Sequence, residues 1–154
     1  MFRVTAYLPA ATAKGVPFDS LTLAHDQRRL RRKVLTLPKG VELLFDFPEP
    51  VTLSHGDRLR LDDNRLVGII AADEAVYEVR GRDATHIARL AWHIGNRHLP
   101  AQIEKSRILI GRDRIIGDML VGLGATVTEK VEHFSPEHGA YSHDLGGGHA
   151  LSAR

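Results

Sequence analysis

Short hydrophobic runs alternate with polar turns through the first half of the chain, and each run is only three to seven residues long. Many short strands at close spacing are typical of a small β-barrel or β-sandwich. The pattern therefore predicts an all-β domain over residues 1–73. Its strands are expected at 3–8, 20–25, 32–37, 41–47, 51–53, 58–61 and 66–71, with Pro48-Glu49-Pro50 as a break between the fourth and fifth.

The pattern changes to a mixture of helices and strands after residue 73. Ile87, Leu90 and Ile94 recur at three- and four-residue steps, which indicates an amphipathic helix that Asp83 can cap. The elements expected in order are a strand (75–79), a helix (83–95), two strands (101–103 and 107–110), a helix (113–123) and a strand (126–131). This β-α-β-β-α-β order predicts a ferredoxin-like domain over residues 74–134, and hence an α+β protein.

Residues 135–154 lose this hydrophobic periodicity and are rich in Gly, Ser and His. A segment of that composition cannot bury enough apolar surface to offset the entropy of ordering it. The sequence therefore predicts a flexible, histidine-containing tail at the C-terminal end of the chain.

Composition narrows the possible locations and chemistry. The 154 residues contain no apolar run of the roughly 20 residues that a membrane span needs, and the first residues lack the apolar core of a secretory signal. A cytoplasmic protein without a membrane partner is expected. The chain has no cysteine and nine histidines, so a metal site would use imidazole rather than thiolate ligands.

Three histidines fall within residues 83–100, the segment that contains the first predicted helix. His86 is expected at the surface or at the edge of the core. His93 is open between a structural role and metal binding. Gly95-Asn96 ends the helix, and His98 follows immediately, where its side chain is held by the fold but is free of the packing of the helix. Three histidines in one segment of a chain without cysteine predict metal binding through imidazole ligands.

Several motifs in the second half of the chain resemble the urease accessory protein E family. The first is WHIGNRHLPAQ, residues 92–102, in which GNRHLP is the most specific part. The others are Arg112-Asp113-Arg114, Gly117-Asp118-Met119-Leu120, Gly122-Leu123-Gly124-Ala125 and Gly139-Ala140-Tyr141, with weaker similarity in Arg3-Val4-Thr5, Leu8-Pro9 and the basic strand from Arg28 to Lys33.

The resemblance implies a nickel metallochaperone of urease maturation, without catalytic turnover. It implies an N-terminal β domain that binds a peptide or protein, and a ferredoxin-like metal-binding domain that forms a homodimer. His98 of each subunit would bind one Ni(II) at the dimer interface, with His138, His143 and His149 completing the coordination. Zn(II) or Cu(II) could replace nickel in vitro. The implied partners are a urease maturation GTPase and the urease preactivation complex.

The sequence departs from the family pattern at two places. Some relatives carry histidines beside the aspartate that corresponds to Asp113, whereas this chain has Arg112 and Arg114, so additional surface metal sites are expected to be absent or weak. Asp113 itself is expected to be a helix cap. The late histidines lie five or six residues apart rather than in a dense run, which predicts few nickel ions per dimer.

Two other functions can be compared with the chaperone. A metal-dependent hydrolase would need three clustered ligands and a general base, and the sequence has no HExxH motif. A nucleic-acid-binding module could use the basic strand 28–33, but the aromatic residues do not follow the stacking pattern of such modules. Strand alternation should place the cations of residues 28–33 on opposite faces, which disfavours one dense patch. The basic strand can be interpreted either as a solvated strand face or as a binding surface for an acidic partner.

Overall fold

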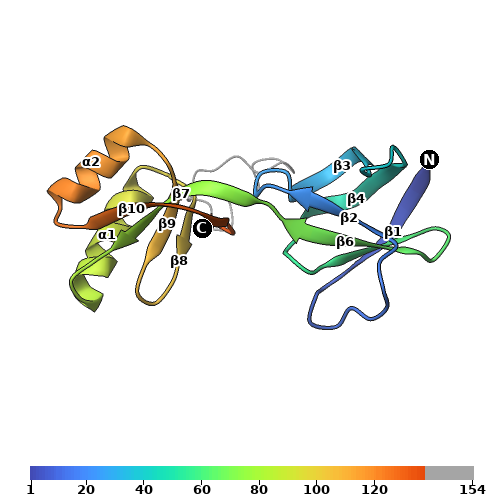
Figure 1. Cartoon of the computed structure of the whole chain (residues 1–154), viewed down its shortest axis with the longest axis horizontal. Helices are drawn as coiled ribbons and strands as arrows, with labels where there is room; N and C mark the ends of the chain where they lie inside the picture. Colours follow the sequence, from blue (N-terminus) through green and yellow to red (C-terminus); the bar gives the residue numbers. More distant parts are fainter. Residues whose placement is uncertain (138–154) are drawn as a thin grey trace. The chain divides into compact units, whose positions relative to one another are not determined.

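The computed structural model describes residues 1–137, which form two compact units, residues 1–72 and residues 73–137 (Figure 1). The first unit is all β and the second combines a sheet with two helices, so the predicted α+β class is confirmed. None of the helices in this part of the chain is long and apolar enough to cross a bilayer. The predicted tail histidines, His138, His143 and His149, lie beyond residue 137 and outside the described residues.

The N-terminal unit is a curled, six-stranded sheet with the strand order β2-β6-β5-β1-β4-β3. Strands β1 and β4 pair in parallel, as do β2 and β6, and the other neighbours are antiparallel. The strands are β1 (Phe2–Leu8), β2 (Asp19–Leu23), β3 (Arg29–Thr36), β4 (Glu42–Thr52), β5 (Arg58–Leu61) and β6 (Leu66–Ala71). Strand β3 is therefore at one edge of the sheet.

The core of this unit comes from alternate residues of neighbouring strands. Leu43 and Phe45 of β4 are fully buried, as are Leu59 and Leu61 of β5, and they belong to one hydrophobic cluster. Successive side chains of a strand point to opposite faces, so this two-residue period buries one face of the sheet. The hydrophobic runs of the predicted strands therefore supply the core of this unit.

The expectation that Pro48-Glu49-Pro50 ends a strand is wrong, because β4 runs through it. Leu30 of β3 pairs with Val51, and Arg32 pairs with Asp46, so residues 47–50 stand opposite Arg31 alone. The two prolines cannot donate a ladder hydrogen bond, and the strand accommodates them as a bulge rather than by stopping.

The C-terminal unit has the predicted β-α-β-β-α-β order and an antiparallel sheet with the strand order β10-β7-β9-β8. Its elements are β7 (Asp73–Arg80), α1 (Ala84–Asn96), β8 (Ala101–Ile103), β9 (Ile108–Gly111), α2 (Arg114–Gly122) and β10 (Thr126–His133). Asp83 and Asp113 cap the helices, as expected, by accepting hydrogen bonds from the backbone N–H groups of His86 (2.8 Å) and Ile116 (3.1 Å).

Both helices pack on one face of this sheet. Leu90 of α1 and Leu120 of α2 share a hydrophobic cluster with Val79 and Ile108 of the sheet. Val76 and Leu109, which alternate with those positions, lie in a separate cluster with Phe134. The chain after β10 thus covers the other face. It continues to Glu137, whose N–H donates to the carbonyl of Ala101 in β8 at 2.8 Å.

A network of charges joins the strands of this unit. The guanidinium of Arg107 contacts carboxylate oxygens of Glu78 (3.0 Å), Glu104 (3.1 Å) and Glu132 (2.7 Å), and Arg80 contacts Glu78 at 3.0 Å. The Arg80 hydrogen bond, with that of Arg107, lowers the pKa of the Glu78 carboxyl. The Arg107 hydrogen bond lowers the pKa of Glu132. The network therefore favours the folded state when these carboxyls are ionised.

Lowering the pH is expected to weaken this unit through the same network. A carboxyl with a lowered folded-state pKa stabilises the fold above its unfolded pKa of 4.5, and this contribution is lost as the pH falls through the folded-state value. Arg107→Gln should lower the free energy of unfolding by about 1–2 kcal/mol at pH 7. The difference from wild type should shrink steadily below the unfolded pKa.

Urea unfolding at several pH values, followed by the fluorescence of Trp92, would measure this effect, because the chain's single tryptophan lies in the C-terminal unit. Lys105→Gln is the matched control, since it removes one exposed cation from the same loop. A difference between Arg107→Gln and wild type that stays constant with pH would contradict the prediction.

Candidate metal site

Helix α1 ends at Asn96, Arg97 is its C-cap, and His98 follows the cap. Gly95 accepts a hydrogen bond from the backbone N–H of His98 at 3.0 Å, and Ile94 accepts one from Arg97 at 3.1 Å, which closes the last turn. His98 has φ = 58°, in the left-handed region. This position after a helix is usually occupied by glycine, sometimes by asparagine, because a Cβ atom is unfavourable there.

A histidine in this conformation costs about 1 kcal/mol relative to an unstrained backbone. Among residues 1–137 the only other non-glycine with positive φ is Asn64, a residue type that tolerates this conformation. The backbone of the chain would thus be more stable with glycine at 98. Because residues in such conformations are concentrated at functional sites, His98 is a candidate functional residue.

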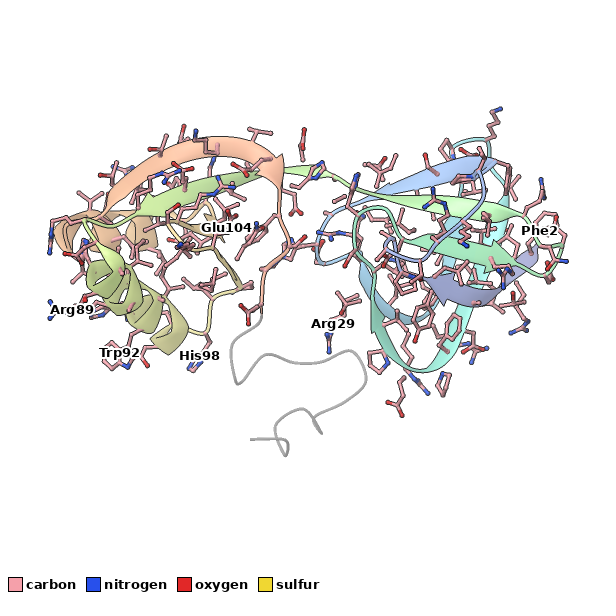
Figure 2. All side chains as sticks on the ribbon, turned by 90° about the horizontal axis from the view of Figure 1, so that it is seen from below. Phe2, Arg29, Arg89, Trp92, His98 and Glu104 are labelled. Atoms are coloured by element: carbon pink, nitrogen blue, oxygen red, sulfur yellow. The ribbon has the colours of Figure 1, made fainter. Side chains whose placement is uncertain are left out.

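Two large hydrophobic side chains of α1 and β8 are exposed. Trp92 is 64% exposed and Ile103 is 48% exposed, although both side chains are large and hydrophobic. Trp92 and His98 project from the same side of the unit at the end of α1 (Figure 2). A shallow depression of about 150 Å³ lies between α1 and β8 and is lined in part by Leu99, Ala101 and Ile103. Exposed hydrophobic side chains beside an apolar depression make this end of the unit a candidate protein interface.

The other predicted ligands are not assembled around His98 in the described part of the chain. His93 is half-buried, and its ring makes an edge contact with Trp92 at a centroid distance of 5.1 Å. Residues 1–137 contain no group of three His, Cys, Asp or Glu side chains placed to hold one metal ion. His138, His143 and His149 lie outside these residues. Residues 1–137 of one chain therefore do not contain a complete metal site of this kind.

His86 is in the interior, whereas the sequence suggested the surface or the core edge. It is 4% exposed, and its Nδ1 accepts a hydrogen bond from the backbone N–H of Arg82 at 3.0 Å. Its Nε2 lies 2.8 Å from the carbonyl oxygen of Leu123. Because a backbone N–H can only donate, the proton of the neutral ring is on Nε2, which donates to Leu123. His86 therefore links the start of α1 to the end of α2.

Arg112, which precedes Asp113, has a structural role. The guanidinium of Arg112 donates to the carbonyl of Val76 in β7 at 3.1 Å and to the carbonyl of Lys130 in β10 at 2.9 Å. Asp113 caps α2 through its side chain. These contacts account for both residues without metal binding.

The five cations of the basic segment from Arg28 to Lys33 differ in exposure. Arg28 is buried, Arg29 is half-buried, and Arg31, Arg32 and Lys33 are all exposed. The register between β3 and β4 shifts between Leu30 and Arg32, and from Arg32 onward the pairing is regular, with Arg32 opposite Asp46 and Lys33 opposite the buried Phe45. Arg32 and Lys33 therefore leave β3 on opposite faces, as strand alternation predicts.

Comparison with known proteins assigns both units. A family model described as "UreE urease accessory protein, N-terminal domain" matches residues 4–72, and "UreE urease accessory protein, C-terminal domain" matches residues 74–153.

Curated relatives match over almost the whole chain. Urease accessory protein UreE 1 of Brucella suis biovar 1 (strain 1330) is 57% identical over 150 residues, which cover 97% of this chain and 90% of the relative. Urease accessory protein UreE of Rhizobium leguminosarum bv. trifolii (strain WSM2304) is 52% identical over 152 residues, which cover 95% of this chain and 79% of the relative. With both domain models and these relatives in agreement, the chain belongs to the UreE family of urease accessory proteins.

Proposed function

We propose that this protein is a nickel metallochaperone that carries Ni(II) to urease during assembly of the urease active site. The observation that supports this most is His98, an exposed imidazole held in a left-handed conformation that glycine would adopt at lower cost. Membership of a urease accessory family supplies the context in which the metal is nickel. Neutral imidazole suits this borderline cation.

The proposed site is shared by two copies of the chain. Residues 1–137 of one chain contain no group of three possible metal ligands. A two-fold axis beside His98 would pair this histidine with its copy in a second chain, without any further change of sequence. The exposed side chains of Trp92 and Ile103 would be covered in such a homodimer. Two fixed imidazoles with the remaining positions open suit a protein that must release its ion.

His138, His143 and His149 are proposed to add ligands from the end of the chain, and His93 is a further candidate beside the interface. Zn(II) and Cu(II) should compete in vitro, because imidazole binds them as well. The proposed recipients are a urease maturation GTPase and the urease preactivation complex in the cytoplasm. Neither nucleic acid nor membrane has a part in this proposal.

A calorimetric nickel titration of the purified, tag-free protein, with its molar mass measured by light scattering, would test the proposal. We expect a dimer that binds one tight Ni(II) per two chains, because each chain supplies one His98. The mass should be dimeric both before and after nickel is added, since the apolar contact does not need the ion. Tight binding of one ion to each monomer, or no binding, would contradict the shared site.

The same titration on a chain truncated after Tyr141 separates the role of the tail from that of His98. We expect weaker binding or fewer ions, with the shared ion retained, because His143 and His149 are removed and His98 is not. An isotherm identical to that of the full chain would exclude both tail histidines as ligands.

A further inference from the structure

Four basic residues of β3 line one depression at the surface of the N-terminal unit. The depression has a volume of about 420 Å³, and its lining includes Arg29, Arg31, Arg32 and Lys33, with Leu30 between them and Asp26 beside them. We call it the β3 groove. Figure 2 marks Arg29 in this unit. The cations in the lining outnumber the carboxylates, so the groove has an excess of positive charge.

Contacts within the unit occupy only part of the hydrogen-bonding capacity of these cations. Residues 47–50 of β4 bulge opposite Arg31, and the carbonyl of Pro48 accepts a hydrogen bond from Nε of Arg31 at 3.1 Å. This contact uses one donor of a guanidinium that has five. Arg32 makes a 3.8 Å contact with Asp46, but its side chain remains 71% exposed. Most of the donor capacity of these two arginines therefore stays available to another molecule.

The position of β3 supplies a second kind of contact. Among residues 1–137, β3 forms ladder pairs with β4 alone, so it is an edge strand. The outward backbone groups of an edge strand can pair with an additional extended chain. Arginine is also suited to bidentate contacts with carboxylates. An extended acidic peptide would satisfy the backbone edge and the cations together.

We propose that the β3 groove is a docking site for an extended acidic segment of a partner protein. Nucleic acid is the less suitable ligand, because the groove lining contains no aromatic side chain on which a base could stack. The inference goes beyond the proposed nickel function. It rests on residues 26–33 and requires neither His98 nor a metal.

Fluorescence anisotropy with a labelled ten-residue peptide of alternating Glu and Thr tests the proposal. Competing probes are the matching Lys-Thr peptide and a ten-nucleotide single-stranded RNA. We expect the acidic peptide to bind and to weaken as salt is raised, because the contacts are partly exposed. The triple variant Arg31→Glu, Arg32→Glu, Lys33→Glu should lose at least about tenfold in affinity, or about 1.4 kcal/mol.

The matched control is the triple variant Lys14→Glu, Lys39→Glu, Arg60→Glu, which makes the same charge change at exposed positions of the same unit outside the groove. It should bind within about threefold of wild type after the same long-range charge loss. A milder variant, Arg32→Gln with Lys33→Gln, should weaken binding in the same direction if the triple variant fails to fold.

Three binding results would overturn the proposal: no binding of the acidic peptide at low salt, an equal loss of affinity in the control triple variant, or RNA binding at least as tight as peptide binding. A fourth is a lower molar mass of the groove variant than of wild type, which would show that the groove is an interface between copies of the chain. A nickel titration of the groove variant should match wild type. Failure of the docking proposal and failure of the nickel proposal can therefore be distinguished.

Discussion

Replacing His98 with glycine is expected to abolish the tightest nickel site while leaving the C-terminal unit at least as stable as in the wild-type chain. The loss of affinity should be at least about 100-fold, or about 2.8 kcal/mol, because a shared site loses an imidazole from each of two chains. The free energy of unfolding should rise by up to about 1 kcal/mol, because residue 98 has φ = 58° and glycine has no Cβ to strain there.

Nickel calorimetry and urea unfolding followed by Trp92 fluorescence measure the two effects separately. His98→Ala is the first control: it should lose nickel equally but show no gain in stability, because alanine keeps the Cβ atom. Asn64→Gly is the second: it changes the other left-handed non-glycine residue of the described chain and should not affect nickel. Nickel binding by His98→Gly at wild-type affinity would remove His98 from the mechanism.

The second large effect is expected at His86, on stability rather than on metal binding. His86→Ala should lower the free energy of unfolding of the C-terminal unit by about 2–3 kcal/mol. The variant loses a ring that is 4% exposed, and with it the hydrogen bonds to the N–H of Arg82 and to the carbonyl of Leu123. It therefore leaves a cavity and two backbone groups with a missing partner.

His93→Ala is the matched control for His86→Ala, because it truncates a half-buried histidine of the same helix whose ring contacts Trp92. Its cost should stay below about 1 kcal/mol, as for a partly exposed side chain. Under conditions in which His86→Ala is fully folded, its nickel-binding isotherm should match that of the wild-type protein. A loss of stability no larger than that of His93→Ala would show that the bridge between the helices contributes little.

Local sequence rules were enough for most of the C-terminal unit. The three- and four-residue spacing of Ile87, Leu90 and Ile94 placed α1 correctly to within one residue, and Asp83 and Asp113 were identified as caps. These predictions succeed because a helix buries residues and satisfies its first N–H groups within a few positions of the chain. The strands at Arg58–Leu61 and Leu66–Ala71 were likewise predicted with correct bounds.

Features that depend on distant residues were not predicted. The carbonyl that accepts from His86 belongs to Leu123, 37 residues further along the chain. The β3 groove lies on an edge strand whose register with β4 shifts between Leu30 and Arg32, and that pairing joins segments far apart along the chain. Neither a spacing nor a residue type near His86 or Arg31 reports such a partner.

By itself, the sequence determined the order of elements, the helix caps, the family motif around His98 and the absence of thiolate ligands. Those properties follow from residues that are neighbours along the chain. Only the tertiary structure decided that His98 adopts a left-handed backbone beside exposed Trp92, that His86 is a buried bridge, and that the basic residues share one groove. These depend on which strands and helices pack together, because burial and hydrogen-bond partners are set by contacts between segments that are far apart in sequence.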